Sequence, residues 1–154
     1  DAPLHAVLPS IAAAHGERYA GYTIRRVCNE MHAFYRASNV KDLQRLCFRA
    51  SSFPELAMLP KDAYEALVAN DVDYVPLDEA RGRISATLAL IYPPGIGVVL
   101  PGERWDERAK PMFDYFMTFQ ESFNRFPGFN YEVQGVFQER ENGRILFYTY
   151  VVRE

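Results

Sequence analysis

Apolar residues recur every three or four positions over Tyr22–Ala37, which predicts an amphipathic helix. Thr23 can cap its start, and Ser38-Asn39 ends it. The predicted buried stripe consists of Ile24, Val27, Cys28, Met31, Phe34 and Tyr35. The polar residues of the other side are Arg25, Arg26, Asn29 and Arg36. These arginines form either a solvated surface, or a subunit contact or anion site.

Two further helices are predicted downstream. The first covers Lys41–Ala50, with Asn39 as its cap, and its inward residues are Leu43, Leu46, Cys47 and Ala50. The second begins at Pro60, because proline is well suited to the first position of a helix, and it runs to about Ala69. We expect this helix to bury Tyr64, Leu67 and Val68.

A longer helix is predicted after Trp105-Asp106, with Pro111 early enough to be tolerated near the first turn. Its apolar positions alternate in steps of four and three and are mostly aromatic: Met112, Phe116, Phe119, Phe123 and Phe126. Such a continuous aromatic seam is typical of a core. The alternatives are a ligand pocket or a surface that packs on a neighbouring domain.

The strand signals are of two kinds. Val72–Leu77 alternates apolar and polar residues, and Pro76 favours an edge position. Tyr131–Glu139 and Arg144–Val152 flank Glu141-Asn142-Gly143, and Asn-Gly between two β-rich runs predicts a hairpin. Because strands and helices do not alternate regularly, we expect an α+β fold. It would comprise three N-terminal helices, a mixed or antiparallel sheet, one long aromatic-rich helix and a C-terminal β-hairpin.

The rest of the predicted fold is arranged around Gly82–Glu103, which is called the rigid stretch below. An apolar strand from Ile84 to Ile91 leads into Tyr92-Pro93-Pro94-Gly95, and a short apolar run then ends at Pro101-Gly102. The two prolines exclude a helix or a central sheet ladder, and they push Tyr92 into an extended conformation. Gly95 and Gly102 suit turns that need a positive φ. The tyrosine hydroxyl would thus stand on a rigid backbone at the end of a buried strand, as in the wall of a site.

Composition narrows the function classes. The 154 residues are 49% hydrophobic and 14% aromatic, with a formal net charge of −3. An acidic chain of this kind is a poor nucleic-acid binder, and no run of about 20 apolar residues could span a membrane. No signal peptide is visible, so we expect a cytoplasmic protein without membrane or nucleic-acid partners. Residues 1–16 resemble a connector from an upstream domain, and residues 17–154 form one domain.

Candidate chemistry within the chain is sparse. His5, His15 and His32 lack the spacing of a metal site, and neither a Gly-x-Ser-x-Gly nor a phosphate-loop motif occurs. We expect Cys28 and Cys47 to be buried thiols in a reducing compartment; a disulfide would need their helices to pack side by side.

Two residues near the rigid stretch have alternative roles. Glu103 is either a charge at the N-terminus of the following helix or a substrate contact. A buried Tyr92 would need a hydrogen-bond partner, which is either structural or a ligand.

The motifs of the rigid stretch identify a resemblance. Gly-Arg-Ile-x-Ala, Tyr-Pro-Pro-Gly-Ile and Pro-Gly-Glu resemble the C-terminal domain of bacterial fold-type I ornithine, lysine and arginine decarboxylases. Phe126–Phe129 and Tyr22–His32 continue the likeness, which covers roughly residues 17–152. Glu17–Arg25 and Val40–Gln44 look most like the ornithine branch. Many members have a proline where this chain has Gly97. The sequence therefore leaves open whether this loop is more flexible than in those members.

The resemblance implies a function that the chain would share with a longer enzyme. Such enzymes bind pyridoxal 5′-phosphate (PLP) through a lysine of an upstream domain, and Lys41, Lys61 and Lys110 match no such motif. The C-terminal domain helps to wall the substrate channel. By this resemblance Tyr92 reaches the substrate, Pro93, Pro94 and Gly95 hold it in place, and Glu103 is a further channel residue.

The expected partners are therefore the upstream PLP-binding domain, an amino acid substrate and further copies of the enzyme in a dimer or larger oligomer. The predicted reaction is the decarboxylation of ornithine to putrescine, and the isolated chain should be inactive. The alternative is a non-catalytic module for assembly or effector binding. Its supporting features are the arginine-bearing helix and the excess of aromatic residues.

Overall fold

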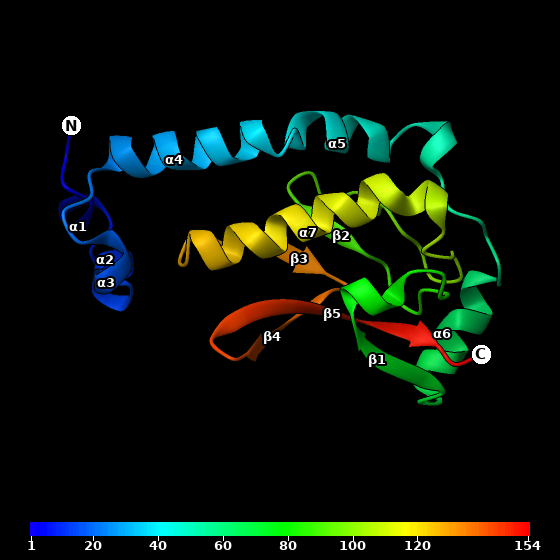
Figure 1. The fold of residues 1–154 in the computed structure, drawn as a ribbon. Helices are drawn as coiled ribbons and strands as arrows, with labels where there is room; N and C mark the ends of the chain where they lie inside the picture. The colour runs from blue at the N-terminus through cyan, green and yellow to red at the C-terminus, as the bar shows by residue number, and fades with distance from the viewer.

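The computed structural model describes residues 1–154 and has three layers (Figure 1). Helices α4 (Ile24–Ala37) and α5 (Val40–Cys47) lie end to end along one side. Helix α7 (Lys110–Arg125) lies beneath them, and the main β-sheet lies on the far side of α7. This arrangement confirms the predicted α+β fold, and all strand pairs are antiparallel.

Three short helices precede α4: α1 (Leu4–Val7), α2 (Pro9–Ala14) and α3 (Gly16–Tyr19). Leu4, Tyr19 and Val27 form a small separate core there. The Tyr19 hydroxyl donates to the carbonyl of Pro127 at 2.9 Å, just beyond the end of α7. At the start of α4, the Thr23 hydroxyl accepts from the Arg26 amide at 3.2 Å, which confirms the predicted cap.

The predictions for the two shorter helices were right in position but partly wrong in detail. The first helix ends at Cys47 rather than Ala50, and Leu46, which was expected to face inward, is 42% exposed. Asn39 precedes α5 with a φ of 51° and makes no capping bond through its side chain. The helix α6 (Pro60–Val68) begins at Pro60 as predicted. However, Tyr64 and Val68 are 61% and 69% exposed, and the fully buried residue is Ala63. A small side chain lets this helix lie close to the sheet, so the burial of the two larger residues was wrongly predicted.

The aromatic seam of α7 is the core of the protein. Met112, Phe116, Phe119 and Phe123 are all buried, and Pro111 lies in the first turn as expected. Phe123 packs edge-on against Phe147 of the sheet at 5.3 Å between ring centroids. The helix is preceded by the 3₁₀ turn η3 (Glu107–Ala109). The seam is thus core, as its spacing indicated, with α5 on one side and the sheet on the other.

The main sheet has the strand order β1 (Val72–Pro76), β5 (Arg144–Val152), β4 (Phe137–Glu141). The strand β1 lies at an edge, as Pro76 predicted. Strands β4 and β5 form the predicted hairpin, and Asn142 and Gly143 at its turn have φ values of 48° and 79°. Two successive positive φ values are those of a type I′ turn, which Asn-Gly favours. Further 3₁₀ turns are η1 (Ala50–Ser52) and η2 (Leu77–Ala80).

A second, two-stranded sheet pairs β2 (Leu90–Tyr92) with β3 (Glu132–Gln134). The continuous strand predicted from Ile84 to Ile91 is therefore wrong over most of its length. The Ser85 hydroxyl donates to the Thr87 carbonyl at 2.9 Å, a local bond that interrupts the strand. Residues 84, 85 and 89 instead form single β-bridges to three different segments. The predicted strand Tyr131–Glu139 is likewise split in two, at Gly135.

Gly135 is the junction between the two sheets. It has a φ of 70°, and its carbonyl accepts hydrogen bonds from the hydroxyls of Thr87 and Thr149, both at 2.8 Å. A β-carbon at this position would lie 2.1 Å from the carbonyl oxygen of Leu88. Only glycine satisfies both the backbone conformation and this close approach.

We expect Gly135→Ala to destabilise the protein by about 3 kcal/mol or more, because strained φ and overpacking each cost about 1–3 kcal/mol. The measurement is urea-induced unfolding at neutral pH. Gly16→Ala is the matched control, because Gly16 has open space around it and no positive φ. Equal stability of the two variants would contradict the role of Gly135.

The two cysteines differ in exposure, so the expectation for Cys28 was wrong. Cys47 is 1% exposed, whereas Cys28 lies on an exposed part of α4. No group of three or more His, Cys, Asp or Glu residues is placed to hold a metal ion. No helix has the length and apolar character needed to cross a bilayer.

Native protein should therefore have one rapidly reacting thiol. Burial raises the pKa of Cys47 to about 12, which suppresses its thiolate as well as its access. Titration with Ellman's reagent should show fast reaction at Cys28 alone, and Cys28→Ser should abolish it. Two fast thiols in folded protein would contradict the burial of Cys47.

Candidate functional site

The Tyr-Pro-Pro-Gly corner projects from the end of β2. Both Tyr92-Pro93 and Pro93-Pro94 are cis, Gly95 has a φ of 75°, and its amide donates to the Ile91 carbonyl at 3.2 Å. The Tyr92 ring lies against Gly95, where a β-carbon would come within 2.5 Å of the ring. Gly95 thus allows the positive φ of the turn, and its lack of a side chain leaves room for the Tyr92 ring.

Tyr92 is exposed, although the strand leading to it is buried. Ile91 is 2% exposed and Tyr92 is 55% exposed, and the Tyr92 hydroxyl has no hydrogen-bond partner within the chain. The sequence left open a structural or a ligand partner for a buried hydroxyl. The structure instead presents an unpartnered hydroxyl at the surface on a rigid corner.

The second corner is formed by Leu100–Glu103. The Glu103 amide donates to the Leu100 carbonyl at 3.1 Å, and Gly102 has a φ of 86°, as in a type II turn with proline at its second position. A β-carbon on Gly102 would lie 2.2 Å from the carbonyl oxygen of Met58. This corner is therefore packed against the loop before α6 and is rigid, as its sequence indicated.

Glu103 closes its own turn. Its carboxylate accepts from the Leu100 amide at 2.7 Å. Burial raises the pKa of Glu103, and the Leu100 hydrogen bond only partly opposes this effect. Glu103 does not cap the N-terminus of the following helical segment. Asp106 does so, because its carboxylate accepts from the amides of Arg108 and Ala109 at 2.9 and 3.0 Å.

Exposed apolar residues precede and follow the Tyr92 corner along the chain. Leu88, Ile96 and Leu100 are 42%, 55% and 42% exposed. Leu88 and Leu100 close over Gly97, where a β-carbon would lie 2.5 Å from one and 3.2 Å from the other. Gly97 is therefore held tightly between two leucines.

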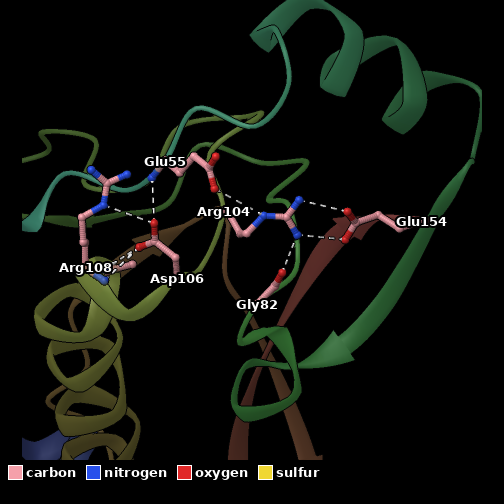
Figure 2. Close-up of polar contacts among 7 residues, drawn as sticks. Glu55, Gly82, Arg104, Asp106, Arg108 and Glu154 are labelled. Atoms are coloured by element: carbon pink, nitrogen blue, oxygen red, sulfur yellow. Dashed lines mark hydrogen bonds and ion pairs between the residues drawn. The ribbon is translucent and has the colours of Figure 1, made fainter.

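The ends of the rigid stretch are fastened together by Arg104 (Figure 2). Its guanidinium donates to the Gly82 carbonyl at 2.6 Å and to the Glu154 carboxylate at 3.0 and 3.2 Å. Glu55 lies 3.9 Å away, and the Arg104 backbone amide donates to the Glu55 carbonyl at 2.9 Å. Sequence reasoning missed Arg104, because its partners lie 22 and 50 positions away.

The three histidines and the arginines of α4 lie elsewhere. His32, Arg36 and Lys41 line an open groove of about 520 Å³ at the junction of α4 and α5. Arg26 pairs with Glu30 and lies over the Tyr22 ring at 3.9 Å. None of these residues lines the corner at Tyr92, so the candidate site consists of Tyr92, its two prolines, Gly95 and the apolar surface around them.

The geometry agrees with a known family. A family model described as "Orn/Lys/Arg decarboxylase, C-terminal domain" matches residues 41–153. The chain belongs to this family. The matched region includes both rigid corners, Arg104 and the hairpin.

Individual relatives cover nearly all of the chain. An inducible ornithine decarboxylase of Escherichia coli is 46% identical over 99% of this chain and 20% of its own length. One from Lactobacillus is 45% identical over 96% of this chain and 20% of its own. The solved structure of lysine decarboxylase A from Pseudomonas aeruginosa has a TM-score of 0.88 at 34% identity, over 99% of this chain and 20% of that one. The chain thus spans about a fifth of the curated relatives it matches.

Glu103→Gln tests the role of the turn carboxylate. Because burial raises the folded-state pKa above its ordinary 4.5, the folded protein binds more protons than the unfolded chain above that pH. The charge then opposes folding as pH rises, by about 0.5 kcal/mol for a partly exposed group.

We therefore expect Glu103→Gln to gain stability relative to wild type between about pH 4 and pH 7. The glutamine oxygen can still accept from Leu100. The measurement is the free energy of unfolding of both proteins across this range, with exposed Glu17→Gln as control. A difference that does not change with pH would contradict the assignment.

Proposed function

We propose that this chain is the C-terminal domain of a PLP-dependent decarboxylase that converts ornithine to putrescine and carbon dioxide. The observation that supports this best is the order of identities. Four relatives named ornithine decarboxylase are 43–46% identical to the chain. Relatives named lysine or arginine decarboxylase are 41%, 30%, 32% and 29% identical.

The cofactor would be held outside this chain. Lys61 and Lys110 pair with Glu65 and Asp114 on helix surfaces, and Lys41 is exposed. A lysine that forms a Schiff base is commonly activated by desolvation, and all three lysines are exposed. When bound, PLP supplies the electron sink for loss of carbon dioxide. The contribution of this chain is to bound and orient the substrate.

Tyr92 is the residue that we place at the substrate. Its side chain is exposed, its hydroxyl has no partner in the chain, its backbone is fixed by two prolines and Gly95, and the neighbouring Ile96 is an exposed apolar residue. A polar group that converges on a mostly apolar wall is the usual composition of a ligand site. Pro93, Pro94 and Gly95 would hold the tyrosine, and Glu103 would shape the wall by closing its turn.

The proposal also states how this chain relates to the remainder of a longer enzyme. Residues 1–16 would connect the domain 17–154 to an upstream PLP-binding domain of the same polypeptide. The family resemblance further implies a cytoplasmic enzyme that forms a homodimer or larger oligomer. The chain's share of its relatives, about a fifth, leaves ample length for the upstream domain.

The proposed reaction is tested by carbon dioxide release from the full-length enzyme with PLP. We expect release from ornithine and much less from lysine or arginine. Preference for lysine or arginine would keep the family and overturn the proposed substrate. No release from any of the three, in a protein without a bound cofactor, would overturn the enzymatic proposal.

Tyr92→Phe in the full-length enzyme should reduce kcat/KM for ornithine about tenfold, because the variant loses one hydrogen bond to a charged substrate. Folding and PLP content should not change. Tyr64→Phe is the matched control, since Tyr64 is similarly exposed on α6. Wild-type kinetics in Tyr92→Phe would contradict the role in substrate positioning.

The second candidate is a module for effector binding or assembly. The groove at the α4–α5 junction supports it, because Arg36 and Lys41 have no ion-pair partner in the chain and lie beside His32. The substrate assay separates the two functions. Only the decarboxylase proposal requires carbon dioxide release that depends on Tyr92.

A further inference from the structure

The main sheet has two different faces. Residues of β5 alternate between them, and Phe147 and Val151 point toward the core beneath α7. Tyr148 and Tyr150 point to the opposite face, where α6 packs over the end that contains Val72 and Val152 and against part of Tyr150. The remainder of that outer face has no covering layer in the chain (Figure 1).

Four aromatic rings meet on this uncovered area. Tyr74 of β1 lies 4.7 Å from Tyr150 and 5.0 Å from Tyr148, between ring centroids. Phe137 of β4 lies 5.5 Å from Tyr150 and 6.1 Å from Tyr74. Tyr74 and Phe137 are 38% and 42% exposed. The rings thus form one continuous surface across all three strands.

Carboxylates border the rings. The Tyr74 hydroxyl donates to Glu139 at 2.7 Å, and the Tyr148 hydroxyl donates to Glu141. Glu79 lines a small cavity together with Pro76 of β1 and Leu146 of β5. None of these three glutamates has an ion-pair partner in the chain. The hairpin's Arg144 pairs instead with Glu121 of α7.

We propose that Tyr74, Phe137, Tyr148 and Tyr150, with Glu79, Glu139 and Glu141, form a docking surface for a protein partner that presents lysine or arginine side chains. These seven residues are called the aromatic–acidic face. The proposal is independent of the decarboxylase activity and of the Tyr92 corner.

Charge complementarity is the reason for choosing a basic partner. Cations bind to the faces of tyrosine and phenylalanine rings, and the bordering carboxylates add ionic partners. An uncharged apolar partner would bury the carboxylates without supplying a cation to pair with them, which is costly. An open sheet face also offers a broad area, as protein interfaces need, whereas small ligands prefer a concave site.

The test uses the full-length enzyme and a fluorescein-labelled peptide of alternating lysine and serine. Binding is measured by fluorescence anisotropy at low ionic strength, where exposed charges are least screened. We expect Glu139→Gln with Glu141→Gln to weaken binding about tenfold. Tyr74→Leu should weaken it by a similar factor without a change of net charge.

The matched control for charge is Glu17→Gln with Glu107→Gln. Both glutamates are exposed, neither is ion-paired, and the change of net charge is the same. This control should alter binding less than about twofold. Equal weakening by the two double variants would show general attraction to an acidic protein and would overturn the proposal, as would absence of binding to wild type.

Hydroxyl-radical footprinting of the full-length enzyme shows whether the aromatic–acidic face is covered by the peptide or already by another part of the enzyme. The proposal requires that Tyr74 and Phe137 are labelled in the enzyme alone and protected when the peptide is added. Protection before the peptide is added would show that another part of the enzyme covers the face, and would overturn the proposal. The circular dichroism of each variant must match wild type, and the two glutamine variants test the proposal even if Tyr74→Leu unfolds.

Discussion

The carbonyl of Gly135 is the contact on which the two sheets depend. It accepts from Thr87 and Thr149, so one backbone oxygen joins the rigid stretch to the central strand of the main sheet. The positive φ at this residue turns the chain out of β3 and into β4. Because these hydroxyls are buried and bonded, the cost of burying them is offset only in this one arrangement of the sheets.

Two further contacts hold the rigid stretch in place, one near this junction and one at its base. Near the junction, β2 is fixed by its pairing with β3, so Tyr92 emerges from a defined edge. At the base, Arg104 binds the Gly82 carbonyl and the C-terminal Glu154 (Figure 2). The stretch between is therefore a closed loop with a fixed base and a paired strand. Such rigidity suits the wall of a substrate channel, where misplaced groups lose their effect on rate.

Local signals in the sequence predicted local structure well. The Asn142-Gly143 turn, the Thr23 cap and the phenylalanine seam of α7 each depend on residues within a few positions of one another, and all three were confirmed. Long-range packing was not predictable in this way. The strand expected over Ile84–Ile91 is interrupted by the local Ser85–Thr87 bond and by the bond from Thr87 to the distant Gly135, and α6 is oriented by the small Ala63.

At the candidate site, too, local features were predictable from the sequence and long-range contacts were not. The Tyr-Pro-Pro-Gly motif and the Pro-Gly corner identified the rigid elements, and the glycines have the positive φ values that turns require. Their fastening by Arg104 and the exposure of Tyr92 depend on distant partners and could not be read from one chain. The role of Glu103 required its distance to Leu100, since the sequence alone offered a charge at a helix N-terminus or a substrate contact.

The central claim is that the Tyr92 corner forms part of the wall against which the substrate binds. The most direct test is an experimental structure of the full-length enzyme with PLP and a non-reactive ornithine analogue. The account predicts that the Tyr92 hydroxyl lies about 3 Å from a polar atom of the analogue, or reaches it through one water. A structure in which other side chains separate Tyr92 from the analogue would contradict the account.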